Sequence, residues 1–124
     1  SREIQEATKD AIRAVGLSDK VFESVNRLSG GQQRRVAIAR AMVQNPRLIL
    51  ADECLGELDA ETAKEIIELL RSLAKEKDIA ICIVDHNPLR ARTFCDRLLQ
   101  LRGNSLIEFD NLNEKHSLPQ AGDR

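Results

Sequence analysis

The sequence lacks tryptophan and tyrosine, and phenylalanine occurs only three times among 124 residues. Single-stranded nucleic acids stack on aromatic rings, so this scarcity argues against that kind of binding. No charge of one sign prevails either, because 19 Lys and Arg stand against 20 Asp and Glu. A dedicated nucleic-acid binder or a polybasic membrane anchor would be basic. We therefore expect no nucleic-acid partner.

Cysteine is also scarce. Cys54, Cys82 and Cys95 form no CxxC pair, and their number is odd. This pattern favours reduced thiols in a cytosolic setting over a disulfide framework or a zinc site. No apolar run approaches the length of a membrane-spanning helix. The apolar fraction of 42% is ordinary for a soluble globular protein, and the length suits one domain.

Helically spaced apolar residues predict two helices in the first part of the chain. The first covers residues 3–15 and ends at Gly16, and the second begins at Ser29 and stops at Asn45-Pro46. A short irregular segment connects them. Its expected apolar contacts are Val21, Phe22 and Val25.

The rest of the chain alternates strands with helices. Continuous apolar runs at 48–51 and 79–84 predict strands that are buried on both faces, as in a parallel sheet. The remaining expected elements are a long helix at 59–77, a short helix at 88–95, and hairpin strands at 97–101 and 105–109. This order predicts an α/β fold class with a helical pair ahead of the sheet.

Two adjacent glycines follow Ser29 at the expected start of the second helix. Gly30 and Gly31 leave backbone N–H groups open to a close ligand, and the helix dipole favours an anion there. The Ser29 hydroxyl can bond the same anion. A plain helix cap with Ser29 as the N-cap residue explains the same pattern. The turn by itself favours the cap.

Two acids follow the first predicted strand. Ligands of open α/β sheets collect outside the carboxyl ends of the strands. At that edge Asp52 would hold Mg²⁺ through water, and Glu53 would orient or deprotonate an attacking water. A solvated strand end carrying two acids is the alternative, and the pair in isolation favours it.

His86 comes directly after the second predicted strand. A neutral imidazole there can hydrogen-bond a terminal phosphate and the water-activating acid. The alternative is a loop histidine beside an N-cap formed by Asp85 or Asn87. Asp59 lies where the N-cap of the long helix belongs, and a second role at a subunit interface is compatible with it.

The order and spacing of these features are more specific than any one of them. The run from Leu28 to Ala41, the run 48–53, Leu58-Asp59 and His86 together resemble the nucleotide-binding domain of ABC transporters. The resemblance extends over about residues 4–109. It implies that nucleotide is bound by Asp59 and by the signature motif, which comprises Ser29, Gly30, Gly31 and Gln32. It further implies a Walker B aspartate for metal at Asp52, a catalytic Glu53, a D-loop from Gly56 to Asp59, and a catalytic switch histidine at His86.

The resemblance also implies a function. An ABC-type ATPase binds ATP and Mg²⁺ and hydrolyses ATP to energise transport, working peripherally on the cytoplasmic face of the cell membrane. Two such domains pair head to tail, and each ATP lies between the phosphate loop of one and the signature motif of the other. Transmembrane permease subunits are the further partners. Phosphonate-type importers and lipoprotein-release or macrolide-export ATPases are expected as near relatives.

The chain departs from the family pattern in three places. It has no GxxxxGK[ST] run, so the phosphate loop is expected in a missing N-terminal half. Cys54-Leu55 follow the acid pair where the family often has Pro and then Thr or Ser, which removes proline's rigidity from that loop. Asp85 precedes His86 where the family commonly has Thr.

The expected fold is therefore a partial P-loop NTPase domain without its Walker A half. Residues 1–46 would be part of the helical subdomain, residues 47–110 the C-terminal part of the ATPase core, and residues 111–124 a flexible tail. We expect a fragment of a longer polypeptide or an incomplete sequence rather than the product of a split gene. Alone, the chain should bind ATP poorly and hydrolyse it negligibly.

Two other functions stay open at this point. One is a soluble ABC-type ATPase of DNA repair or translation. Repair ATPases split the domain with a coiled coil, but no long heptad run precedes residue 28. The other is a non-catalytic half-domain that supplies its signature face in trans.

Overall fold

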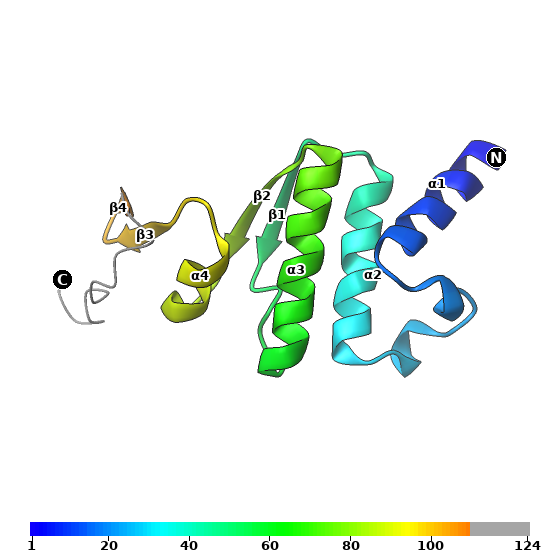
Figure 1. The fold of residues 1–124 in the computed structure, drawn as a ribbon, viewed down its shortest axis with the longest axis horizontal. Helices are drawn as coiled ribbons and strands as arrows, with labels where there is room; N and C mark the ends of the chain where they lie inside the picture. Colours follow the sequence, from blue (N-terminus) through cyan, green and yellow to red (C-terminus); the bar gives the residue numbers. More distant parts are fainter. Residues whose placement is uncertain (110–124) are drawn as a thin grey trace. The chain divides into compact units, whose positions relative to one another are not determined.

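The computed structural model describes residues 1–109, which fall into two compact units. The first unit is Ser1–Val84, and the second begins at Asp85 (Figure 1). The flexible tail expected at 111–124 lies outside the described residues. The proposed division of the chain at residues 46 and 110 stays a prediction.

The first helix, α1 (Arg2–Ala14), ends as the sequence predicts. Gly16 has a φ of +73°, which glycine adopts without steric cost. The N–H groups of Gly16 and Leu17 donate to the carbonyl oxygens of Arg13 and Ile12, at 3.0 and 3.1 Å. These two bonds form a Schellman motif, which satisfies carbonyls that the helix end leaves without partners.

The connecting segment contains two short 3-10 helices, η1 (Ser18–Lys20) and η2 (Val25–Arg27). The apolar contacts expected here are wrong, since Val21, Phe22 and Val25 are 51, 102 and 52% exposed. A 3-10 turn of three residues presents little surface to neighbouring helices. Val15 and Leu17, which precede the segment, are buried in their place.

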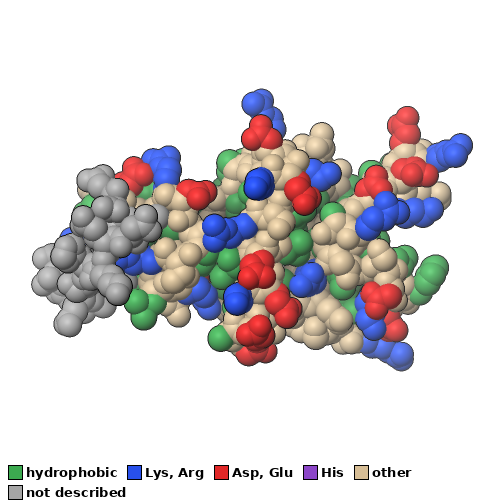
Figure 2. Space-filling view, viewed as in Figure 1, with side chains coloured by type: hydrophobic (Ala, Val, Ile, Leu, Met, Phe, Trp, Pro, Cys, Tyr) green, Lys and Arg blue, Asp and Glu red, His purple; other side chains and the backbone are tan. Residues whose placement is uncertain are grey.

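Two longer helices, α2 (Gly30–Val43) and α3 (Ala60–Lys77), lie side by side, and α1 packs on α2 (Figure 1). The apolar stripe predicted for α3 is confirmed, with Ala63, Ile66, Leu70 and Leu73 all buried. On the opposite side, acidic and basic side chains intersperse over the helices (Figure 2). The helix is thus amphipathic, with one face in the core and one in water.

The sheet of this unit pairs β1 (Leu48–Asp52) with β2 (Ala80–Val84) in parallel, as predicted. Side chains on the face toward the helices are buried or half-buried; they are Ile49, Ala51, Ile81 and Ile83. Those on the other face are exposed; they are Leu48, Leu50, Asp52, Ala80, Cys82 and Val84. The prediction of strands buried on both faces is therefore wrong. A sheet face is buried only by what packs on it, and within Ser1–Val84 the helices cover one face alone.

The second unit contains α4 (Pro88–Phe94) and a hairpin of β3 (Leu99–Arg102) and β4 (Ser105–Glu108). The strands pair antiparallel with Arg102 opposite Ser105, so two residues form the loop. Gly103, the first of them, has a φ of +55°, as tight hairpin loops require. The predicted short helix and hairpin are confirmed. Among the described residues, no helix has the length and apolar character needed to cross a membrane.

Candidate functional site

The signature turn is a capping box. The Ser29 hydroxyl accepts the Gln32 N–H at 3.2 Å, and Gln32 Oε1 accepts the Ser29 N–H at 3.0 Å. The cap interpretation of Ser29 is therefore confirmed. An accepting hydroxyl still carries its own proton, so Ser29 keeps the capacity to donate a hydrogen bond to an anion. Capping and anion binding are compatible at this residue.

The first turn of α2 also leaves donors open. Across residues 1–109, the N–H groups of Gly30 and Gly31 donate to no protein acceptor. They are the first two N–H groups of a helix, which have no intrahelical partner. Together with the Ser29 hydroxyl they form the kind of helix N-terminus at which phosphate oxygens bind.

The glycines also pack closely against the start of α3. A Cβ built on Gly30 would lie 3.4 Å from Leu58 Cδ2, and one built on Gly31 would lie 2.6 Å from Thr62 Cγ2. The first distance is an ordinary contact, whereas the second is a clash. Packing alone therefore favours glycine at residue 31. The structure brings the signature turn and the predicted D-loop together.

Asp59 is the N-cap residue of α3, as predicted. Its carboxylate accepts the Thr62 N–H at 2.7 Å and the Thr62 hydroxyl at 3.0 Å. The hydrogen bond from the Thr62 N–H lowers the pKa of Asp59. The cap holds the end of the D-loop where α3 begins.

The acid pair lies at the carboxyl end of the sheet. Asp52 is the last residue of β1 and is exposed, and its register partner on β2 is Val84. The Glu53 N–H donates to the Val84 carbonyl at 3.0 Å, which extends the ladder by one bond. Glu53 itself has a φ of +53°, in the left-handed region. The strand therefore ends in a sharp turn at Glu53.

The described residues fit a magnesium ion that is held by one carboxylate and completed by water and phosphate oxygens. Among the described residues, no group of three or more His, Cys, Asp or Glu side chains is placed to hold a metal. Mg²⁺ commonly uses one or two carboxylates and completes its shell with water and substrate phosphates. The exposed carboxylate of Asp52 suits that role, and an all-protein cage is not formed.

Two residues for which the sequence predicted no structural role hold the loop after the acids. Leu55 is only 1% exposed, which makes it an anchor of the loop in the core. Arg34 of α2 donates from Nη2 to the Gly56 carbonyl at 3.1 Å. The buried loop leucine was visible in the sequence as an apolar residue between acids. The Arg34 contact spans 22 positions and had no local signal.

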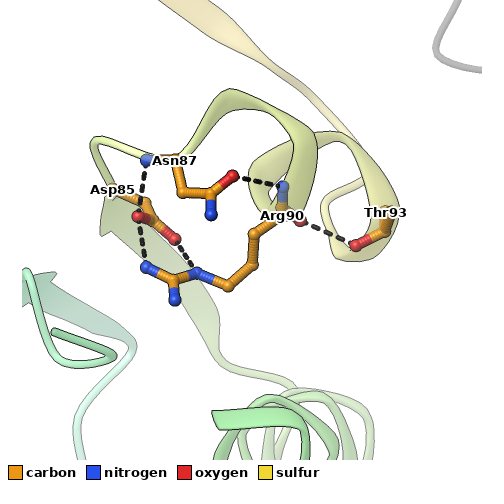
Figure 3. A network of polar contacts seen from close by, with 4 residues as sticks. All are labelled: Asp85, Asn87, Arg90 and Thr93. Atoms are coloured by element: carbon orange, nitrogen blue, oxygen red, sulfur yellow. Dashed lines mark hydrogen bonds and ion pairs between the residues drawn. The ribbon is translucent and has the colours of Figure 1, made fainter. Parts of the chain in front are cut away.

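His86 belongs to the second unit, where its neighbours form a polar network (Figure 3). The Asp85 carboxylate binds Arg90 through two bonds of 2.6 Å and accepts the Asn87 N–H at 2.9 Å. The hydrogen bond from Arg90 lowers the pKa of Asp85. Asn87 caps α4 by accepting the Arg90 N–H at 3.0 Å. The residues on both sides of His86 are therefore fixed, and the N-cap role considered for Asn87 is confirmed.

Comparison with known proteins shows which family the chain resembles. The family model described as ABC transporter matches residues 2–56. The methionine import ATP-binding protein MetN of Corynebacterium efficiens is 39% identical over 91% of this chain and 32% of its own length. The phosphite import ATP-binding protein PxtA of Stutzerimonas stutzeri is 44% identical over 86% of this chain and 38% of its own.

A third relative is the lipoprotein-releasing system ATP-binding protein LolD of Ehrlichia ruminantium, 43% identical over 83% of this chain and 46% of its own length. The chain thus spans 32 to 46% of the length of these relatives. CbiO1 from Clostridium perfringens, part of the ABC transporter complex cbiONQ, has a TM-score of 0.75 at 32% identity, covering 79% of this chain and 39% of that structure.

A second solved structure, an ATP-binding cassette of an ABC transporter in its ADP conformation, has a TM-score of 0.75 at 28% identity. The match covers 80% of this chain and 39% of that structure. Motifs, α/β topology, curated relatives and solved structures agree. Together these matches support an ABC transporter nucleotide-binding domain with the P-loop NTPase fold, of which the chain forms a part.

Proposed function

We propose that the chain supplies the signature and Walker B parts of an ATPase that energises transport across a membrane. The observation that carries this proposal is the pairing of two features in one unit. The signature turn offers a hydroxyl and open N–H groups at a helix N-terminus, and Asp52-Glu53 stand at the carboxyl end of a parallel sheet. The relatives named above are ATP-binding proteins of import and release systems, which supports the same reading.

In this proposal the two groups of residues serve different nucleotides. Ser29, Gly30, Gly31 and Gln32 bind the terminal phosphates of ATP held by another domain, through hydrogen bonds to phosphate oxygens. Asp52 holds Mg²⁺, which neutralises phosphate charge when bound. Glu53 orients or deprotonates the attacking water, and His86 donates a hydrogen bond near the terminal phosphate. Asp59 sets the D-loop at the interface between the two domains.

The proposal also assigns partners and a place. The chain works with a segment that supplies the phosphate loop and pairs head to tail with a second ATPase domain. Both contact transmembrane permease subunits at the cytoplasmic face of the membrane. The exposed, mixed-charge outer faces of the helices suit a domain that is in water on that side (Figure 2).

The test is reconstitution. The chain is combined with a polypeptide that carries the phosphate loop, and ATP hydrolysis is measured against ATP concentration. We expect saturable, Mg²⁺-dependent hydrolysis that Glu53→Gln reduces by about 100-fold or more. Glu68→Gln, an exposed change on α3, is the matched control and should leave the rate unchanged.

The isolated chain provides a second test of the proposal. It lacks a phosphate loop, so its hydrolysis should be negligible with or without Glu53→Gln. A clear saturable rate from the pure chain, abolished by Glu53→Gln, would show that the expected inactivity is wrong. Failure of the combined polypeptides to form a complex or to hydrolyse ATP would refute the role as an ATPase component.

A further inference from the structure

We propose that Arg34 is a positioning residue, which holds the turn Glu53–Gly56 and through that turn sets the place of Glu53. The proposal deepens the function proposed above and rests on it, because Glu53 matters only if it activates water. Arg34 would not touch ATP itself. It would act through the carbonyl oxygen of Gly56, to which its guanidinium donates at 3.1 Å.

The turn needs an external hold because its backbone is strained. Glu53 and Glu57 have φ values of +53° and +65°, and neither is glycine. Left-handed conformations are unfavourable for ordinary L-residues and persist only where the surroundings impose them. An internal bond closes the turn, from the Gly56 N–H to the Glu53 carbonyl at 3.1 Å. Because Glu53 is exposed, this bond competes with water.

Two residue types in the loop allow its backbone freedom. Cys54 occupies a position where proline would have limited the backbone, and Gly56 has no side chain to pack. Leu55 anchors the loop in the core at one point, since it is 1% exposed. At the start of the turn, the Glu53 N–H is bonded to the Val84 carbonyl at 3.0 Å. A second, directional contact holds the far end of the turn at Gly56.

Arg34 supplies this second contact from a rigid element. It lies on α2, one turn beyond the Ser29 cap, so its backbone is set by the helix. Its guanidinium is half-buried and donates a charge-assisted bond, which is stronger than a neutral one. The same bond joins the loop after Walker B to the signature helix. Movement of the signature turn would therefore be transmitted to Glu53.

The first experiment measures the loop directly in the chain. Amide hydrogen exchange at residues 53–57 is compared between wild type and Arg34→Ala, with the thermal midpoint recorded for each. We expect exchange in this segment to become about tenfold faster in Arg34→Ala while α3 is unchanged. Arg71→Ala, an exposed arginine on α3, is the control and should match wild type. Unchanged exchange at 53–57 overturns the proposal.

The second experiment measures catalysis in the reconstituted ATPase. Arg34→Ala should lower kcat by about tenfold and leave KM for ATP nearly unchanged, because the base is misplaced while binding contacts remain. Arg34→Lys keeps a donor at the same place and should restore most of kcat. A wild-type kcat in Arg34→Ala, or equal losses in Arg34→Lys and Arg34→Ala, overturns the positioning role.

The two experiments separate this proposal from the function on which it rests. If Glu53→Gln leaves hydrolysis by the reconstituted ATPase unchanged, the role of Glu53 is refuted, and with it the catalytic part of the present proposal. Hydrogen exchange would still decide whether Arg34 holds the turn. If Glu53→Gln abolishes hydrolysis and Arg34→Ala does not lower kcat, the function stands and only the role of Arg34 is refuted.

Discussion

Gly31 stands at the contact between the signature turn and the start of α3. The Thr62 methyl group would lie 2.6 Å from a Cβ at this position. Rotation of Thr62 cannot relieve the clash cheaply, because its hydroxyl is bonded to Asp59. We therefore expect Gly31→Ala to lower the free energy of unfolding by about 1–3 kcal/mol, despite the better helix propensity of alanine. Urea unfolding of the chain measures this loss.

Two further variants decide whether packing is the cause. Thr62→Ser removes the methyl group and keeps the hydroxyl, so it should recover most of the stability lost in Gly31→Ala. Gly30→Ala is the matched control, since its Cβ would make an ordinary contact with Leu58 at 3.4 Å. If Gly31→Ala and Gly30→Ala lower the free energy of unfolding equally, the close approach of Thr62 does not restrict residue 31 to glycine.

At the scale of the element, the segment around His86 is held by ionic bonds. Asp85 is bonded twice to Arg90, and its side chain is only 6% exposed. Because Arg90 holds the pKa of Asp85 below its usual range, the pair stabilises the fold above the ordinary carboxyl pKa of about 4. That stability is lost as the pH falls through the lowered pKa. We expect amide protection in α4 to fall as the pH drops below about 4.

The comparison for this prediction is a neutral isostere. Asp85→Asn should reduce protection of α4 at neutral pH and remove its acid dependence, since the titrating group is gone. Glu108→Gln breaks the Arg97–Glu108 pair of the hairpin, which lies in the same unit. It should change protection in β3 and β4 and leave α4 as in wild type. Equal acid dependence in wild type and Asp85→Asn would contradict the prediction.

Elements were predictable where the signal was local. The apolar stripe of α3 and the glycines at residues 16 and 103 report on backbone and periodicity within a few residues. The exposure of Phe22 was not predictable in this way, because exposure depends on what packs against a side chain. For the same reason, the sequence motifs predicted the signature turn and the two Walker B acids. They gave no sign of the Arg34–Gly56 hydrogen bond, which joins the two segments.

At the scale of the whole molecule, one face of the β1–β2 sheet stands open within Ser1–Val84. Leu48 and Leu50 are 54 and 74% exposed, and Val84 is 50% exposed. A two-stranded sheet also has two edges whose backbone groups can pair with another chain. Apolar faces of this kind drive association in water. We therefore expect the isolated chain to self-associate as its concentration rises.

Sedimentation velocity over a range of concentrations tests this expectation. Leu50→Lys places a charge in the middle of the open face and should shift the chain toward the monomer at every concentration. Leu101→Lys is the matched control: Leu101 is 70% exposed but lies in the hairpin of the second unit, so its variant should associate like wild type. A wild-type chain that stays monomeric throughout would contradict the prediction. If Leu50→Lys and Leu101→Lys reduce association equally, the effect comes from the change in net charge and not from the open sheet face.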